Sequence, residues 1–152
     1  MALPIQLSQF NNHLNRLLQL GEDGSPVYSN EFSRLNTEVF QLSECLFGVH
    51  GGTPEEEASL CIALLTGYGV TVYNGGDKEE KIQAVLDRAF EVLSKISDSL
   101  IKCKLLLCCY YKVYEEELLK EAQRIMTSWE GRELTEEEKG IMGEYNEIVR
   151  EI

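Results

Sequence analysis

The sequence has few of the residues that metal sites and nucleophilic sites require. It contains two histidines, His13 and His50, and five cysteines, none of them in a CxxC pair. A zinc site needs about four ligands at short spacings, which this set does not supply. The odd number of cysteines indicates reduced thiols in a cytosolic protein. We expect no metal and no cofactor, while a Cys–His nucleophile pair stays open without a flanking pattern to support it.

The sequence also lacks a glycine-rich phosphate loop. The stretch YNGGDKEEK, residues 73–81, has adjacent glycines followed by Asp77, whereas a phosphate loop follows the pattern GxxxxGK[ST]. A calcium loop counted from Asp77 would need a glutamate at its twelfth position, where Arg88 stands. We interpret the stretch as a helix end, a turn and the start of the next helix. No catalytic residue is predicted, and we expect the protein not to be an enzyme.

Basic residues are scarce. Lys and Arg number 14 against 26 Asp and Glu, a net charge of −12, and none lies between Arg34 and Lys78. Such a chain repels phosphate backbones, so direct binding of nucleic acid is not expected. The charge would suit a basic protein partner drawn in by long-range attraction. Solubility alone explains the acidity equally well.

Long apolar runs are missing too. None is long enough to cross a membrane, so no membrane association is expected. The first residues, MALPIQLSQF, lack the basic start of a signal peptide and any lipidation motif. We therefore expect a cytoplasmic protein.

Helical periodicity is what the sequence has in abundance. Apolar residues make up 43% of the 152 positions, enough for a real core. They recur at helical spacing over about residues 3–18, 30–47, 54–73, 77–93, 98–126 and 135–149. The β-branched GVTVY (69–73) would also allow a strand, but it has no obvious partner strand. We predict an all-α fold, a single compact domain over residues 1–152 with six or seven helices packed as antiparallel helical hairpins.

Capping signals mark several helix starts. Thr53 precedes Pro54 and stands three residues before Glu56, which predicts a capping box. Thr135 stands in the same relation to Glu138. Other candidate caps are Asp77 and, for the helix that follows residue 98, Ser97 or Asp98.

Three EEE triplets differ in their surroundings. Those at 55–57 and 136–138 follow a capping Thr, where acidic groups favour the positive end of a helix. The triplet 115–117 follows a tyrosine-rich stretch instead, with Lys112 and Lys120 placed to offset part of its charge. A plain solvated helix face explains this, and so does a contact surface for a basic partner. The candidate partner-binding residues are Tyr110, Tyr111, Tyr114, Glu115, Glu116 and Glu117.

Helical hairpins raise the question of repeats. Residues 67–93 loosely resemble a tetratricopeptide repeat, but Lys81 stands where a small residue is expected, and the later match at 105–125 is fainter. Stable arrays need at least three repeats. We reject a true array and keep a TPR-like scaffold that binds a basic peptide as an alternative function.

Several stretches together resemble the UpxZ family. They are GEDGSPVYSNEFSRLNTEVF (21–40), TPEEEASLCIALLTGYGVTVYNGGDKEEK (53–81), CCYYKVYEEELLKEA (108–122) and GREL (131–134). Order and spacing agree over most of the chain. None of these stretches is a catalytic fingerprint.

The resemblance implies indirect control of transcription. UpxZ proteins antagonise UpxY-type antiterminators, which are NusG-like proteins that help RNA polymerase read through the leader of a capsular polysaccharide operon. A protein of this kind would inhibit the noncognate antiterminators of other loci, so that one operon predominates. The implied partner is a UpxY-like antiterminator, on its own or in the polymerase complex. The resemblance brings no contact residues with it.

Overall fold

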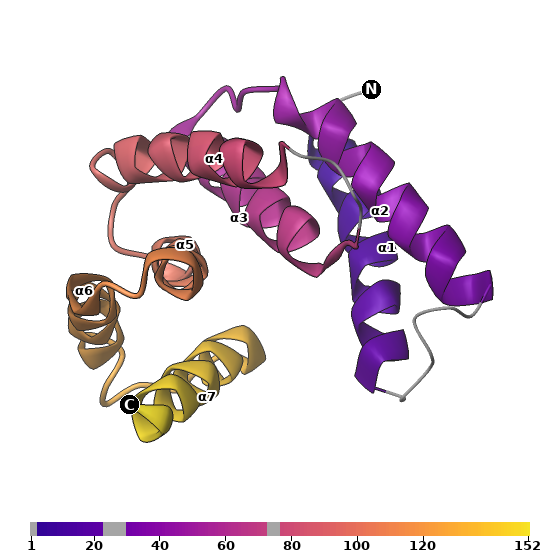
Figure 1. The fold of residues 1–152 in the computed structure, drawn as a ribbon. Coiled ribbons are helices and arrows are strands. Elements are labelled where there is room, and N and C mark those ends of the chain that lie inside the picture. The colour runs from indigo at the N-terminus through magenta and orange to yellow at the C-terminus, as the bar shows by residue number, and fades with distance from the viewer. Residues whose placement is uncertain (1–2, 23–29, 73–76) are drawn as a thin grey trace.

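The computed structural model describes residues 3–22, 30–72 and 77–152, and these form seven α-helices without a strand (Figure 1). The all-α prediction is confirmed. The helices are α1 (Leu3–Glu22), α2 (Asn30–Phe47), α3 (Pro54–Val70), α4 (Lys78–Leu93), α5 (Leu100–Val113), α6 (Glu116–Thr127) and α7 (Glu136–Glu151). The cluster GEDGSP (21–26), whose composition predicts a turn, overlaps the end of α1 and otherwise lies outside the described residues. The 73–76 part of the YNGGDKEEK turn also lies outside them.

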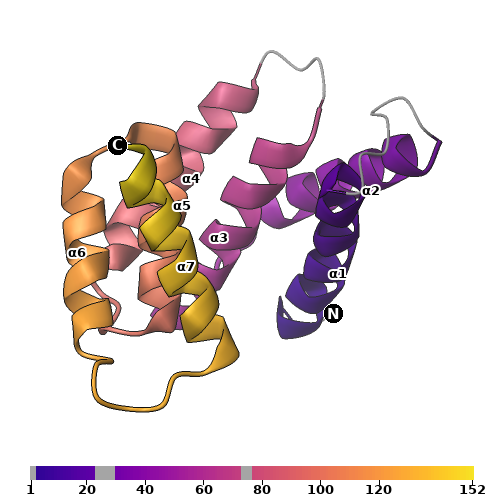
Figure 2. The ribbon, with the colours of Figure 1, turned by 90° about the horizontal axis from the view of Figure 1, so that it is seen from below.

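From α1 to α6 each helix packs against the next, α7 packs against α5, and the helices follow an arc. In Figure 1, α1 and α2 form one end, α3 and α4 follow, and α5, α6 and α7 form the other end. Helix α5 joins the halves, since it contacts α3, α4, α6 and α7. Seen from below, α7 lies along α5, with α3 between α7 and α1 (Figure 2). The protein therefore has a side on which α3, α5 and α7 meet.

Helix α3 is apolar on nearly every side because it is enclosed by its neighbours. It packs against α1, α2, α4 and α5, and Leu60, Leu64 and Tyr68 are fully buried. Gly67 allows the closest approach: a Cβ there would lie 2.5 Å from the Ser43 Oγ and 2.7 Å from the Phe10 ring. The continuous apolar run of α3 is thus the signature of a central helix.

The end of α3 corrects one prediction. The helix stops at Val70 rather than at residue 72 or 73. Thr71 is extended, and its N–H and hydroxyl both donate to the Gly67 carbonyl. The Asn36 side chain on α2 then holds Val72, donating to its carbonyl (2.8 Å) and accepting from its N–H (2.7 Å). This contact with a neighbouring helix replaces the next helical hydrogen bonds.

The caps agree with the predictions only in part. Thr135 and Glu138 form the expected capping box. Thr53 accepts from the Glu56 N–H, but no returning bond from Glu56 forms among the described residues. Asp77 occupies the N-cap position of α4 without a side-chain bond, and its carboxylate lies 3.4 Å from the Lys81 ammonium.

The predicted cap of α5 was wrong. Ser99 is the N-cap, and its hydroxyl accepts from the Lys102 N–H. Asp98, which precedes it, is bound by both terminal nitrogens of Arg124 at 2.8 and 2.9 Å. A strong guanidinium partner from α6 takes the carboxylate that would otherwise be free to cap.

Two apolar residues that helical periodicity places with the core-facing residues lie at the surface. Leu18 on α1 is 40% exposed and Phe90 on α4 is 37% exposed. Leu20 and Val92 are buried instead. The neighbouring helices therefore bury a narrower face of α1 and α4 than the apolar periodicity of these helices predicts.

Candidate functional site

The six predicted partner-binding residues surround a break between α5 and α6. Helix α5 ends at Val113, and Tyr114 takes the left-handed conformation (φ 55°) while its N–H donates to the Tyr110 carbonyl. A tyrosine rarely adopts this conformation, which costs on the order of 1–2 kcal/mol. Glu115 is extended, and α6 restarts at Glu116. Three tyrosines and three glutamates flank this break, and together they are called the tyrosine–glutamate surface.

The tyrosines of this surface differ in exposure. The Tyr110 ring is buried and makes edge contacts with both other rings, at centroid distances of 6.4 Å to Tyr111 and 5.7 Å to Tyr114. Tyr114 is 70% exposed and Tyr111 43%. The Tyr111 hydroxyl donates to Glu144 on α7 at 2.9 Å. Tyr110 therefore supports the surface, and the other two rings can reach a partner.

The glutamates are exposed, and their charge is offset less than the sequence indicated. Lys120 lies 3.6 Å from Glu117, as expected. Lys112 pairs with none of the three, and among the described residues Glu115 and Glu116 make no ion pair. Because α6 begins at Glu116, the helix dipole also explains the acidity here, as it does for the other two triplets.

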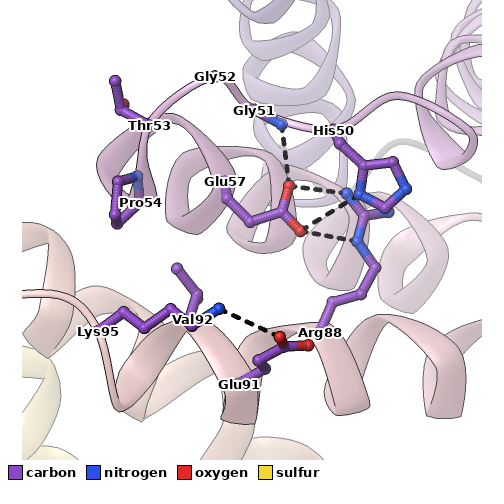
Figure 3. Close-up of a pocket in the computed structure, with 10 residues that line it drawn as sticks. All are labelled: His50, Gly51, Gly52, Thr53, Pro54, Glu57, Arg88, Glu91, Val92 and Lys95. Atoms are coloured by element: carbon purple, nitrogen blue, oxygen red, sulfur yellow. Dashed lines mark hydrogen bonds and ion pairs between the residues drawn. The ribbon is translucent and has the colours of Figure 1, made fainter.

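A second feature, missed in the sequence, is a clasp between the α2–α3 connection and α4. The guanidinium of Arg88 donates to the Glu57 carboxylate at 2.8 and 3.0 Å and to the carbonyls of Phe47 (3.0 Å) and Val49 (2.7 Å). Glu57 also accepts the Gly51 N–H at 3.0 Å. Figure 3 shows Arg88 reaching across to Glu57 with His50 beside them.

The clasp has the electrostatics of a structural ion pair. Burial alone would raise the pKa of Glu57, but hydrogen bonds from Arg88 and the Gly51 N–H outweigh it, and the pKa lies below its usual range. The clasp lines a cavity of about 330 Å³. Lys95, which also lines it, lies 3.2 Å from Glu91, and the His50 ring lies 3.8 Å from Glu57. This cavity has no unmatched charge to offer a ligand.

A third feature is a cavity of about 300 Å³ where α3, α5 and α7 meet. Its floor is uncharged α3 surface around Gly69 and Val70, and its walls carry Lys112 and Glu144. The sequence did not indicate it, because its lining comes from helices far apart in the chain.

The thiols have the character of core residues. Burial raises the pKa of Cys61, Cys103 and Cys109 to about 12 and that of Cys108 to about 11. A nucleophilic cysteine needs a lowered pKa, so this counts against those four. Cys45 is exposed.

The remaining candidate groups are unexceptional. His13 is partly exposed and lies 3.3 Å from Glu38. Over residues 3–22, 30–72 and 77–152, no three His, Cys, Asp or Glu side chains are grouped to hold a metal ion. None of the helices in those ranges is long and apolar enough to pass through a lipid bilayer.

The fold and these surfaces define a class: an acidic, all-helical protein whose exposed features suit contact with another protein. Residues 7–111 match the family described as the UpxZ family of transcription anti-terminator antagonists. The chain is also similar to a crystal structure described as a transcription anti-terminator antagonist UpxZ from Bacteroides uniformis ATCC 8492. That match has a TM-score of 0.84 and 37% identity, and covers 99% of this chain and 94% of the other. No curated protein matches the sequence.

This protein therefore belongs to the UpxZ family of transcription anti-terminator antagonists. The resemblance seen in the sequence is confirmed. The family match ends at Tyr111, but the structural match extends over almost the whole chain, including α6 and α7.

Proposed function

We propose that this protein inhibits transcription antitermination by binding the noncognate, NusG-like UpxY-type antiterminators of capsular polysaccharide operons in the cytoplasm. Membership of a family of anti-terminator antagonists is the observation that carries the proposal. An antagonist that is an acidic helical protein acts most simply by binding the antiterminator or its polymerase complex. Occupying the surface through which the antiterminator engages RNA polymerase would prevent read-through.

We propose the tyrosine–glutamate surface as the contact. Tyr111 and Tyr114 offer exposed aromatic area with a polar tip, as interface tyrosines do. Glu115 and Glu116 lie beside them without an ion pair among the described residues, so a basic partner would not have to displace a cation. A rim of charge of this kind steers association and selects partners more than it adds affinity.

A direct test is a pull-down with purified antiterminators from several capsule loci, combined with read-through in a reconstituted transcription assay. We expect wild-type protein to bind noncognate antiterminators and to lower read-through. Absence of binding together with undiminished read-through would refute the proposal.

The surface is tested with paired variants. Tyr114→Ala and the double variant Glu115→Lys/Glu116→Lys should each weaken binding about tenfold or more, the range of a contact worth about 1.4 kcal/mol or more. The matched control is Glu79→Lys/Glu80→Lys, which reverses two exposed glutamates in the first turn of α4. Equal losses in both double variants would assign the effect to net charge and not to this surface.

The alternative is a general scaffold for basic peptides, which the consecutive hairpins α1–α2, α3–α4 and α5–α6 favour (Figure 1). A scaffold of this kind would bind basic peptides unrelated to antiterminators. Binding restricted to antiterminators would exclude it.

A further inference from the structure

The cavity between α3, α5 and α7 has an uncharged floor. On the side of α3 that faces it, Thr66, Gly69 and Val70 are less than fully buried. Cys108 and Lys112 line it from α5, and Glu144 from α7. Because Gly69 has no side chain, the end of the Lys112 side chain lies against the floor at this point, where a Cβ would meet its ammonium at 2.8 Å. The cavity of about 300 Å³ beside it has room for an apolar side chain from outside.

The two charged side chains of the cavity differ in their partners. Glu144 is occupied, since it accepts the Tyr111 hydroxyl. Lys112 is half-buried, lines the cavity, and forms no hydrogen bond or ion pair with a described residue. Burial, together with the charge of Lys78, lowers the pKa of Lys112 below its usual range. No ion pair with a described residue offsets this desolvation.

This lysine contrasts with the other two lysines of α5. On α5, Lys102 pairs with Asp98 and Glu121, and Lys104 with Glu137. In a chain with net charge −12, carboxylates are in excess, so a half-buried cation without an ion pair is unexpected. Desolvation of a charge is compensated only by an opposite charge in good geometry. The compensating carboxylate can come from a bound partner.

We propose that this cavity receives a segment of the partner protein that bears an apolar side chain beside an Asp or Glu, and that the carboxylate of this residue pairs with Lys112. The inference deepens the proposed function and relies on it only for the identity of the partner. Tyr111 belongs both to the cavity and to the tyrosine–glutamate surface. One partner can therefore place basic residues against Glu115 and Glu116 and insert its apolar, acidic segment next to them.

The test selects short random peptides displayed on phage against the intact wild-type protein. We expect enriched peptides to share a bulky apolar residue within one or two positions of Asp or Glu. Synthetic peptides of the enriched sequence should lose at least about tenfold in affinity for Lys112→Gln, as expected for a charge-assisted contact. The same peptides should lose as much affinity for Gly69→Leu, in which a leucine side chain enters the cavity.

The matched control is Arg150→Gln, which removes one exposed positive charge near the end of α7 that makes no ion pair among the described residues. Its affinity should stay within about twofold of wild type, since exposed charges contribute little. Thermal melts of all three variants check folding. Lys112→Gln removes an uncompensated charge and should not lower the melting temperature.

Selection of no acidic, apolar peptide would overturn the inference, as would equal binding to wild type, Lys112→Gln and Gly69→Leu. This readout uses no antiterminator, so it stands apart from the pull-down. If the pull-down fails and the selection succeeds, the proposed function is wrong and the inference about the cavity stands. If the pull-down succeeds and the selection fails, only the inference about the cavity is wrong.

Discussion

Two glycines of α3 show how much a single position depends on its neighbours. Gly67 and Gly69 lie in one helical turn, in the stretch TGYGV. A Cβ on Gly67 would meet the Ser43 Oγ and the fully buried Phe10 ring, whereas a Cβ on Gly69 would meet the end of the Lys112 side chain at 2.8 Å. A lysine end can move at little cost, and a packed ring cannot.

We expect opposite effects of alanine at these two positions. Gly67→Ala should destabilise the protein by about 1–3 kcal/mol, the usual cost of overpacking a core. Gly69→Ala should be neutral or should stabilise by up to about 1 kcal/mol, because alanine favours the helix. Urea unfolding followed by circular dichroism measures both. Equal destabilisation by the two substitutions would show that Lys112 cannot move aside.

Single residues are also where sequence reasoning fell short. Glu57 was assigned to helix initiation, but it binds Arg88, which lies 31 positions away. Lys112 was assigned to the glutamates that follow it, but it faces α3 instead. Helical spacing shows which residues share a face of one helix. It does not show which neighbouring helix that face meets.

At the scale of elements, helix boundaries followed mostly from local chemistry. Helices α2 and α7 begin and end close to the predicted residues. The capping box of α7 depends only on the adjacent sequence. Helix α3 ends early and α5 has a different cap, since Asn36 and Arg124 from other helices compete for the groups involved.

The capping box of α7 predicts a pH dependence. Hydrogen bonds from Arg132 and from the Thr135 N–H hold the pKa of Glu138 down at about 2. The unfolded value is about 4.3, so the ionised carboxylate stabilises the fold fully above about pH 5. This contribution is lost as the pH falls toward 2.

Glu138→Gln tests this dependence. Its melting temperature should lie below that of wild type at pH 7, and the difference should shrink steadily as the pH falls from about 5 to about 2. Glu136→Gln, in the same first turn but largely exposed, serves as the control. A difference between wild type and Glu138→Gln that does not vary with pH would contradict the assignment.

At the scale of the whole molecule, net charge governs how a partner arrives. A charge of −12 attracts a basic protein over long distances and speeds its encounter. Salt shortens the reach of this attraction, with a Debye length of about 10 Å at 0.1 M and about 3 Å at 1 M.

We expect the association rate with a basic antiterminator to fall about tenfold or more between about 0.1 and 1 M salt, while the dissociation rate changes far less. Stopped-flow fluorescence separates the two rates. A neutral osmolyte at matching osmolarity controls for changes in water activity. An association rate that does not change with salt concentration would exclude electrostatic steering.

The sequence by itself determined the helical class, the approximate positions of the helices, the capping box of α7 and the family. These properties depend on residues close together in the chain or on the order of whole stretches. Only the tertiary structure decided that Arg88 binds Glu57, that α3 stops at Val70 and that Lys112 lies against Gly69 of α3 without an ion pair to a described residue. Each of these depends on which helix faces which, and the packing of the complete core sets that.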